Sequence, residues 1–175
     1  MLRKIIFPLI LGLGGIAVLL WLGFWQVDRL AWKADILTGI DSRLASAPVP
    51  MSLDMTEEDD EYRPVTVSGT TTGTELHVLT SGTAGGTGYR VIAAFQTDAG
   101  PAIMVDLGLL PLEAKENPAQ IARMDITGTL IWPDDENDST PDPDLANNIW
   151  FARNVATMAQ ALDTTPIMVV ADTTD

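Results

Sequence analysis

An uncharged apolar run near the N-terminus is the strongest constraint on this chain. Residues 5–25 read IIFPLILGLGGIAVLLWLGFW. As a helix rising about 1.5 Å per residue, this run spans roughly 30 Å, the thickness of a bilayer's hydrocarbon core. A cleaved signal peptide has a shorter apolar region followed at once by a small-residue site, and the only such site here, Ala45-Ser46-Ala47, comes far downstream. The run therefore predicts an uncleaved transmembrane helix.

The helix is expected to continue beyond the membrane. Apolar and basic side chains recur at helical spacing up to Leu44, and the prolines of the segment Ala47–Pro50 then end the helix. Indole rings, which prefer headgroup depth, stand at Trp21, Trp25 and Trp32. We divide the chain into a membrane anchor with its extension, residues 1–46, and an acidic domain, residues 47–175. Basic residues flank the span almost equally, but the short N-terminal tail and the acidic domain favour a domain outside the membrane.

The charge of the chain excludes some classes of function. The formal net charge is −14, from 24 acidic and 10 basic residues. Such a surface repels a phosphate backbone, so we expect no nucleic-acid partner. The chain has no cysteine, which excludes disulfides, thiolate nucleophiles and cysteine-ligated zinc.

Alternating apolar and polar residues predict a β-rich domain. The expected strands are 65–69, 75–79, 89–97, 102–110, 124–132 and 166–171. Glycine-rich residues 81–88 and the segment Asp98–Pro101 read as turns, and residues 154–162 read as a short helix. The local connections predict an α+β fold, in which an antiparallel, open-barrel-like sheet carries one helix.

Several segments invite a functional interpretation but favour a structural one. The acidic run Glu57–Glu61 is typical of a solvated linker. His77, the single histidine, reads as an ordinary surface or half-buried strand residue, and no hydrolase elbow accompanies it. Residues 134–144 (DDENDSTPDPD) lack the glycine and the final glutamate of a calcium loop, so an exposed loop is expected. Val65–Gly69 and Met124–Gly128 look alike, either by weak duplication or, as we favour, by chance. Nothing in these residues calls for an enzyme.

The segment at the end of the membrane helix carries a family resemblance. Residues 22–33 (LGFWQVDRLAWK) resemble the LGxWQxxRxxWK signature of the surfeit locus protein one family. The candidate partner- or haem-binding residues carried over from that signature are Trp25, Gln26, Arg29, Trp32 and Lys33. The domain residues that match the family's strand starts and its Asn-x-Trp segment are Gly69, Gly88, Tyr89, Asn148 and Trp150. The resemblance extends from about residue 20 to 170.

The resemblance implies a role in respiratory-chain assembly. Members of this family assist the assembly of haem-copper (aa3-type) cytochrome c oxidase, around the delivery of haem a to the catalytic subunit, and are not conventional enzymes. Oxidase subunits are the implied partners and haem a is the implied transient cofactor. The expected location is a bacterial inner membrane with the domain in the periplasm, because the membrane helix starts too early to leave room for a mitochondrial transit peptide.

Two departures from the family pattern open an alternative. Asp106-Leu107-Gly108-Leu109 stands where relatives carry Asn-Arg-Gly-Trp. The family's second membrane helix, with a histidine implicated in haem binding near its start, has no counterpart before Asp175, so either the chain is incomplete or this member has lost them. His77 does not match that histidine. The alternative is a degenerate member that acts as a stable accessory subunit of the oxidase.

Overall fold

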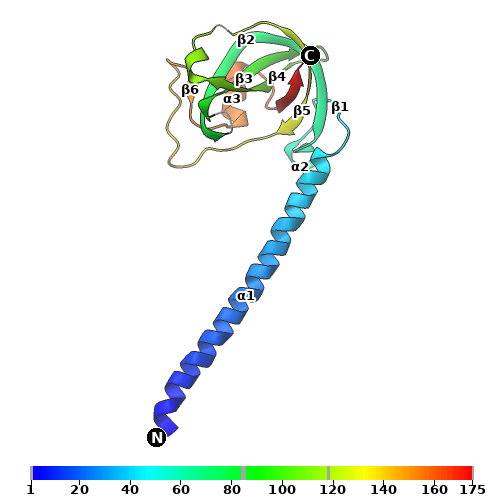
Figure 1. Cartoon of the computed structure of the whole chain (residues 1–175). Coiled ribbons are helices and arrows are strands. Elements are labelled where there is room, and N and C mark those ends of the chain that lie inside the picture. The colour runs from blue at the N-terminus through cyan, green and yellow to red at the C-terminus, as the bar shows by residue number, and fades with distance from the viewer. Residues whose placement is uncertain (1, 84–85, 118, 175) are drawn as a thin grey trace. The chain divides into compact units, whose positions relative to one another are not determined.

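The computed structural model describes residues 2–83, 86–117 and 119–174 (Figure 1). It divides into two compact units, Met1–Ser42 and Arg43–Asp175. The first is helical throughout, and the second holds every strand of the described chain.

The N-terminal unit is one continuous helix. α1 runs from Leu2 to Leu44. From Leu9 onward it is long and apolar enough to cross a membrane, and its large apolar side chains are exposed all around the helix. A helix that is apolar on every face without a protein partner is typical of a lipid-embedded segment. The predicted transmembrane helix and its extension to residue 44 are thus confirmed as a helix.

The second unit is built around one mixed sheet. Its strands are β1 (Val49–Pro50), β2 (Pro64–Thr83), β3 (Gly86–Thr97), β4 (Ala102–Pro111), β5 (Arg123–Ile131), β6 (Ile149–Trp150) and β7 (Met168–Thr174). The sheet order is β1-β2-β3-β4-β7-β5, with β6 beside β2 and a further pairing of β5 with β2. The sheet therefore curls strongly upon itself, in the open-barrel-like manner expected from the sequence.

The long strand β2 causes this curl. The two predicted strands 65–69 and 75–79 are one strand, which pairs with β5 over Pro64–Thr70 and with β3 from Gly69 onward. A register shift between Thr71 and Glu75 bends the strand where its neighbour changes. The look-alike segments Val65–Gly69 and Met124–Gly128 lie directly opposite each other in the β2–β5 pairing.

The sequence had suggested an antiparallel sheet, whereas the observed sheet is mixed. β1 and β6 run parallel to β2, and β7 runs parallel to β4. β7 enters the sheet after a crossover through the short helix α3 (Val155–Leu162), and a crossover of this kind delivers a parallel strand. The spacing of strands along the sequence does not predict these parallel pairings.

α3 is placed by its cap and its apolar face. Asn154 Oδ1 accepts a hydrogen bond from the Thr157 backbone N–H at 3.0 Å, and the helix ends at Asp163 in the left-handed region. The buried side chains on its inner face are Val155, Met158, Ala159 and Leu162. They pack on a core cluster that includes Trp150 and Ile92, while a second cluster around Phe95 and Leu130 covers the opposite face of β3 and β4. The predicted helix at 154–162 is confirmed.

The acidic run is more than a solvated linker. Residues Glu57–Asp60 form a single helical turn, α2, and Asp60 is buried. Arg63 Nη1 lies 2.7 Å from Asp60 Oδ1, and the Thr56 backbone N–H donates to Oδ2 at 3.1 Å. The hydrogen bond from Arg63 holds the pKa of the Asp60 carboxyl below its usual value. The linker interpretation was wrong for Asp60, because Arg63 lies outside the run and its contribution was overlooked.

Candidate functional site

The signature residues of α1 share one face of the helix. At about 100° per residue, Trp25, Gln26, Arg29, Trp32 and Lys33 fall within an arc of roughly 120°. All of them are exposed, with Trp25 at 44% and Trp32 at 55%. We call these residues the signature face.

Arg29 lies between two indole rings on the signature face. Its guanidinium carbon lies 5.8 Å from the centroid of Trp25 and 5.4 Å from that of Trp32. Each contact of this kind is worth about 0.5–1 kcal/mol at an exposed site and restrains the orientation of the guanidinium. In the described part of the chain neither Arg29 nor Lys33 forms an ion pair. The signature face therefore presents oriented cations and an amide that have no anionic partner of their own.

The signature glycines of the domain are required by close strand approach. A Cβ at Gly69 would overlap the Gln96 carbonyl oxygen and the Phe95 ring, and one at Gly88 would overlap the Leu110 carbonyl oxygen. Gly128 meets the Val170 carbonyl in the same way. These positions shape the sheet, and we assign them no direct contact with a ligand.

Tyr89 and Asn148 of the domain signature come together around Glu75 and His77. His77 Nε2 lies 2.8 Å from Glu75 Oε1, and Asn148 Nδ2 donates to the Glu75 backbone carbonyl at 2.9 Å. Asn148 has a φ of 50°, a left-handed conformation that asparagine tolerates better than most residues. The His77 ring is 5.7 Å from the Tyr89 ring. His77 is only 5% exposed, so it is more buried than the sequence suggested.

Trp150 and Lys115 complete the surroundings of this group on opposite sides. Trp150 pairs with Val78 in the β6–β2 ladder and lies in the core, where its indole N–H has no hydrogen-bond partner within the described structure. Lys115 Nζ lies 5.7 Å from the Tyr89 ring and donates to the Asn147 carbonyl at 2.6 Å. The structure thus brings two signature residues together near Glu75 and His77 and places Trp150 in the core cluster that packs against α3.

The segment that departs from the family pattern holds a buried ion pair. Asp106 is fully buried, and its Oδ2 lies 2.6 Å from Arg90 Nε. Its Oδ1 accepts the Gly108 backbone N–H at 3.0 Å, and Gly108 has a φ of 96°. Sequence reasoning missed this pair, although Asp106 interrupts an apolar strand, which is the usual sign of a buried acid with a partner.

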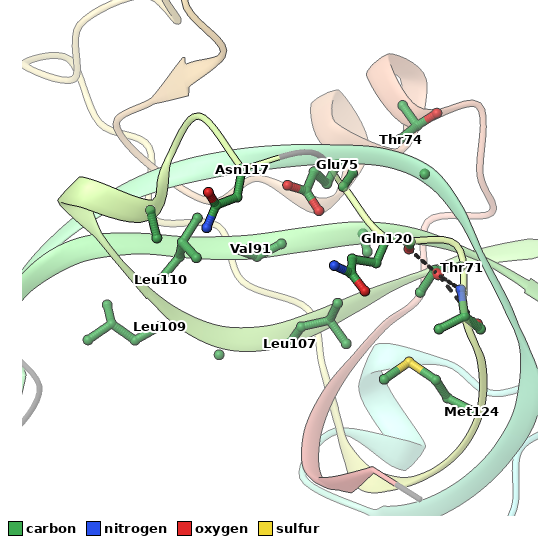
Figure 2. A pocket seen from close by; sticks show the side chains of 16 residues that line it. Thr71, Thr74, Glu75, Val91, Leu107, Leu109, Leu110, Asn117, Gln120 and Met124 are labelled. Carbon is green, nitrogen blue, oxygen red and sulfur yellow. Dashed lines mark hydrogen bonds between the residues drawn. The ribbon is translucent and has the colours of Figure 1, made fainter.

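A groove lies next to Leu107 and Leu109, on the face of β3 opposite to the one that packs against α3 (Figure 2). It has a volume of about 410 Å³ and is bounded by β2, β3, β4 and residues from 114–117 and 119–124. Its apolar lining includes Val91, Ala93, Leu107, Leu109, Leu110 and Met124. Its polar lining includes Thr71, Thr74, Glu75, Asn117 and Gln120. We call it the outer groove.

The acidic residues 134–144 form an exposed loop that is tied to the start of α3. Asn154 Nδ2 donates to Asp134 Oδ1 and Glu136 Oε2, both at 3.1 Å, and Arg153 pairs with Asp135 at 2.7 Å. Within the described ranges of the chain, no group of three His, Asp or Glu side chains is arranged to hold a metal ion. The predicted exposed loop is confirmed.

Comparisons with known proteins decide the family. The SURF1 family model matches residues 13–175, which includes the signature face and the whole domain. This chain belongs to the SURF1 family. It is 29% identical to "Surfeit locus protein 1" of Gallus gallus over 174 residues and 29% identical to the Homo sapiens protein over 176 residues, with 86% of this chain covered in each case.

A yeast relative bears a functional name. The "Cytochrome oxidase assembly protein SHY1" of Saccharomyces cerevisiae is 31% identical over 98 residues, which cover 53% of this chain and 25% of that protein. The chain spans just over half the length of the vertebrate relatives that it matches, 56% of the chicken protein and 58% of the human one. The family resemblance identified from residues 22–33 is confirmed.

Proposed function

We propose that this chain is an assembly factor for haem-copper, aa3-type cytochrome c oxidase, and that it assists the insertion of haem a into the catalytic subunit. The family match over residues 13–175 carries the proposal, since relatives include a protein named for cytochrome oxidase assembly. In this proposal the chain acts by binding and positioning, without catalysing a reaction.

The signature face is the proposed contact with the oxidase. Gln26 and Arg29 lie where α1 leaves the apolar run, and an amide or guanidinium at that depth gains free energy from a partner. Trp25 and Trp32 hold Arg29 in one orientation, so less conformational entropy is lost when it binds. A helix of an oxidase subunit, or the carboxylates of haem a, would supply the missing acceptor.

Haem a is the cargo of this proposed factor. The residues present do not suit a resident haem, because the chain has one histidine and no cysteine, and His77 Nε2 is already hydrogen-bonded to Glu75 inside the domain. What the signature face offers is an ion pair to an acidic group.

The proposed location is the bacterial inner membrane, with α1 as the anchor and the domain in the periplasm. α1 from Leu9 to Leu44 is suited by length and composition to span the bilayer. The short N-terminal tail carries Arg3 and Lys4, and the domain that follows the helix is acidic, which favours a translocated domain although Arg29, Lys33 and Arg43 follow the span.

The experiment is a gene deletion with complementation in the native organism. We expect deletion to lower haem a content in reduced-minus-oxidised spectra and to lower oxidase activity, with both restored by the wild-type chain. Arg29→Gln should restore activity several-fold less well at equal protein level. Arg123→Gln is the matched control, because Arg123 is an exposed arginine paired with Asp98 in the domain. Unchanged haem a and activity in the deletion strain would refute the proposal.

The accessory-subunit alternative rests on the segment Asp106–Leu109. Where relatives carry polar Asn-Arg, this chain has an acid committed to Arg90 and a leucine, so a surface used by relatives is altered here. Quantitative mass spectrometry of purified, active oxidase distinguishes an accessory subunit from an assembly factor. One copy of this chain per mature oxidase would favour the accessory subunit, and its loss on maturation would favour the assembly factor.

A further inference from the structure

The outer groove contains one charged side chain in an otherwise uncharged lining. Glu75 is the single ionisable residue among the described residues that line it. Its side chain is 17% exposed, so the carboxylate is largely removed from water. Within the described chain it forms no ion pair with a lysine or arginine. A carboxylate in such a place is costly unless a cation joins it.

The imidazole of His77, which lies against Glu75, leaves this charge uncompensated. His77 Nδ1 is buried and has no hydrogen-bond partner in the described structure. A doubly protonated ring would leave a buried N–H at Nδ1 without an acceptor, which is costly. The neutral ring with its proton on Nε2 satisfies the bond to Glu75 and leaves only an acceptor unpaired. His77 therefore positions the carboxylate, and no lysine or arginine of the described chain pairs with it.

The walls of the groove favour an apolar ligand. Leu107 and Leu109 are 36% and 37% exposed, and Ile121, at 72%, packs against Gly73 on the groove's border. These side chains form an apolar surface along the groove. Exposed apolar surface that lines a concave site is typical of a binding site.

Hydrogen-bonding groups on the rim favour a polypeptide over a simple amine. The side-chain amides of Asn117 and Gln120 border the cavity and have no hydrogen-bond partner among the residues described, so they are free to bond to peptide groups (Figure 2). Beyond Asp106, β4 pairs only with β3 within the described sheet, which leaves Leu107–Pro111 with an open edge next to the groove. An extended segment can use both features.

We propose that the outer groove binds an extended apolar segment of a partner protein that carries one arginine or lysine, whose cation pairs with Glu75. The apolar side chains of that segment pack on Leu107 and Leu109, and its backbone bonds to the rim amides. This inference goes beyond the proposed function and does not depend on it.

The test uses the full chain in nanodiscs of neutral phosphatidylcholine. The probe is a fluorescently labelled, end-capped peptide of alternating leucine and valine with one central arginine, and its analogue has citrulline in place of arginine. By fluorescence anisotropy we expect the arginine peptide to bind at least about tenfold more tightly. Glu75→Gln should reduce its affinity to that of the citrulline peptide, and Glu113→Gln, a change at an exposed acid outside the groove, should have no effect.

Two further measurements keep the proposal falsifiable. Leu109→Gln should weaken both peptides several-fold, and circular dichroism of each variant verifies its fold. If Glu75→Gln does not fold, a spin label beside the central arginine should still broaden the methyl signals of Leu107 and Leu109 in the wild-type chain. Equal affinity of the two peptides, unchanged binding to Glu75→Gln, or equal binding to empty nanodiscs would overturn the proposal.

Discussion

The helix and the domain of this protein treat their charged side chains in opposite ways. On α1, Arg29 and Lys33 are exposed and have no acidic partner in the described chain, and the rings of Trp25 and Trp32 merely orient Arg29. In the domain, Asp106 is fully buried and bonded to Arg90 and to a backbone N–H. The comparison teaches that the domain pairs its buried carboxylates Asp60 and Asp106 with its own arginines, whereas the helix leaves its cations to its surroundings. Glu75, which is largely buried and has no lysine or arginine partner in the described chain, is the exception within the domain.

The largest effect that separates the two regions is expected from glycine substitution. Gly69→Ala should lower the free energy of unfolding of the domain by about 3 kcal/mol, because the new methyl overlaps the Gln96 carbonyl and the Phe95 ring. Hydrogen-exchange mass spectrometry of domain peptides in detergent measures this loss. Gly23→Ala is the control on α1, where a Cβ meets nothing within 4 Å, and it should leave the domain unchanged.

A somewhat smaller loss is expected at the buried ion pair. Asp106→Ala should cost about 2–3 kcal/mol, because Arg90 is 28% exposed and recovers part of its hydration. Asp106→Asn keeps only one of the two acceptor oxygens, because its amide NH2 then faces either Arg90 Nε or the Gly108 N–H, and it should cost about 2 kcal/mol. Urea denaturation followed by proteolysis of the domain measures both. Equal stability of the alanine variant and the wild type would show that the domain does not depend on this pair.

The contribution of Asp60 to the stability of the domain should depend on pH. Its pKa is lowered in the folded state, so the stabilisation is present above the carboxyl's unfolded pKa and is lost as the pH falls through the folded pKa. Asp60→Asn should remove that part of the acid sensitivity and should lower the free energy of unfolding by about 1 kcal/mol at neutral pH. The test is to measure the free energy of unfolding of the wild type and of Asp60→Asn by denaturation at a series of pH values, from neutral to acidic. If the two stabilities fell in parallel with pH, Asp60 would not be the source of the acid sensitivity.

The smallest effect on the domain is expected from the signature face. Arg29→Gln should change the free energy of unfolding of the domain by less than about 0.5 kcal/mol, since it removes only contacts within α1. The same proteolysis assay measures it. A large destabilisation would mean that Arg29 has a structural partner in the domain, and its effect on oxidase would then not report on binding.

Much of the fold could be predicted from local patterns. The apolar run of residues 5–25 fixes α1, the turn Asp98–Pro101 between two β-like runs locates β3 and β4, and the pattern of residues 124–132 locates β5 to within a few residues. β1 and β6 are two residues long, so they have no periodicity to detect. The parallel pairing of β7 with β4 depends on the crossover through α3, which no strand spacing encodes.

The candidate site was predictable only where a motif was contiguous. The signature face lies within one helical segment, so spacing alone places its residues together. Glu75 stands in the same alternating strand as His77, but its importance depends on Asn148 and on the wall formed by residues from 114–117 and 119–124, both remote in sequence. A pairing such as that of Asp106 with Arg90 needs the strand register before it can be seen.

The length of β2 also governs how fast the domain can fold. Its residues pair with strands that arrive much later in the chain, Pro64 with Thr129 and Val78 with Trp150. Closing loops of this size costs chain entropy before any contact repays it, so a topology dominated by distant pairings folds in milliseconds to seconds. The pairings of β2 with β5 and β6 cannot form until those strands have left the ribosome, although its pairing with β3 can form earlier. During that interval the nascent chain is most exposed to aggregation and proteolysis.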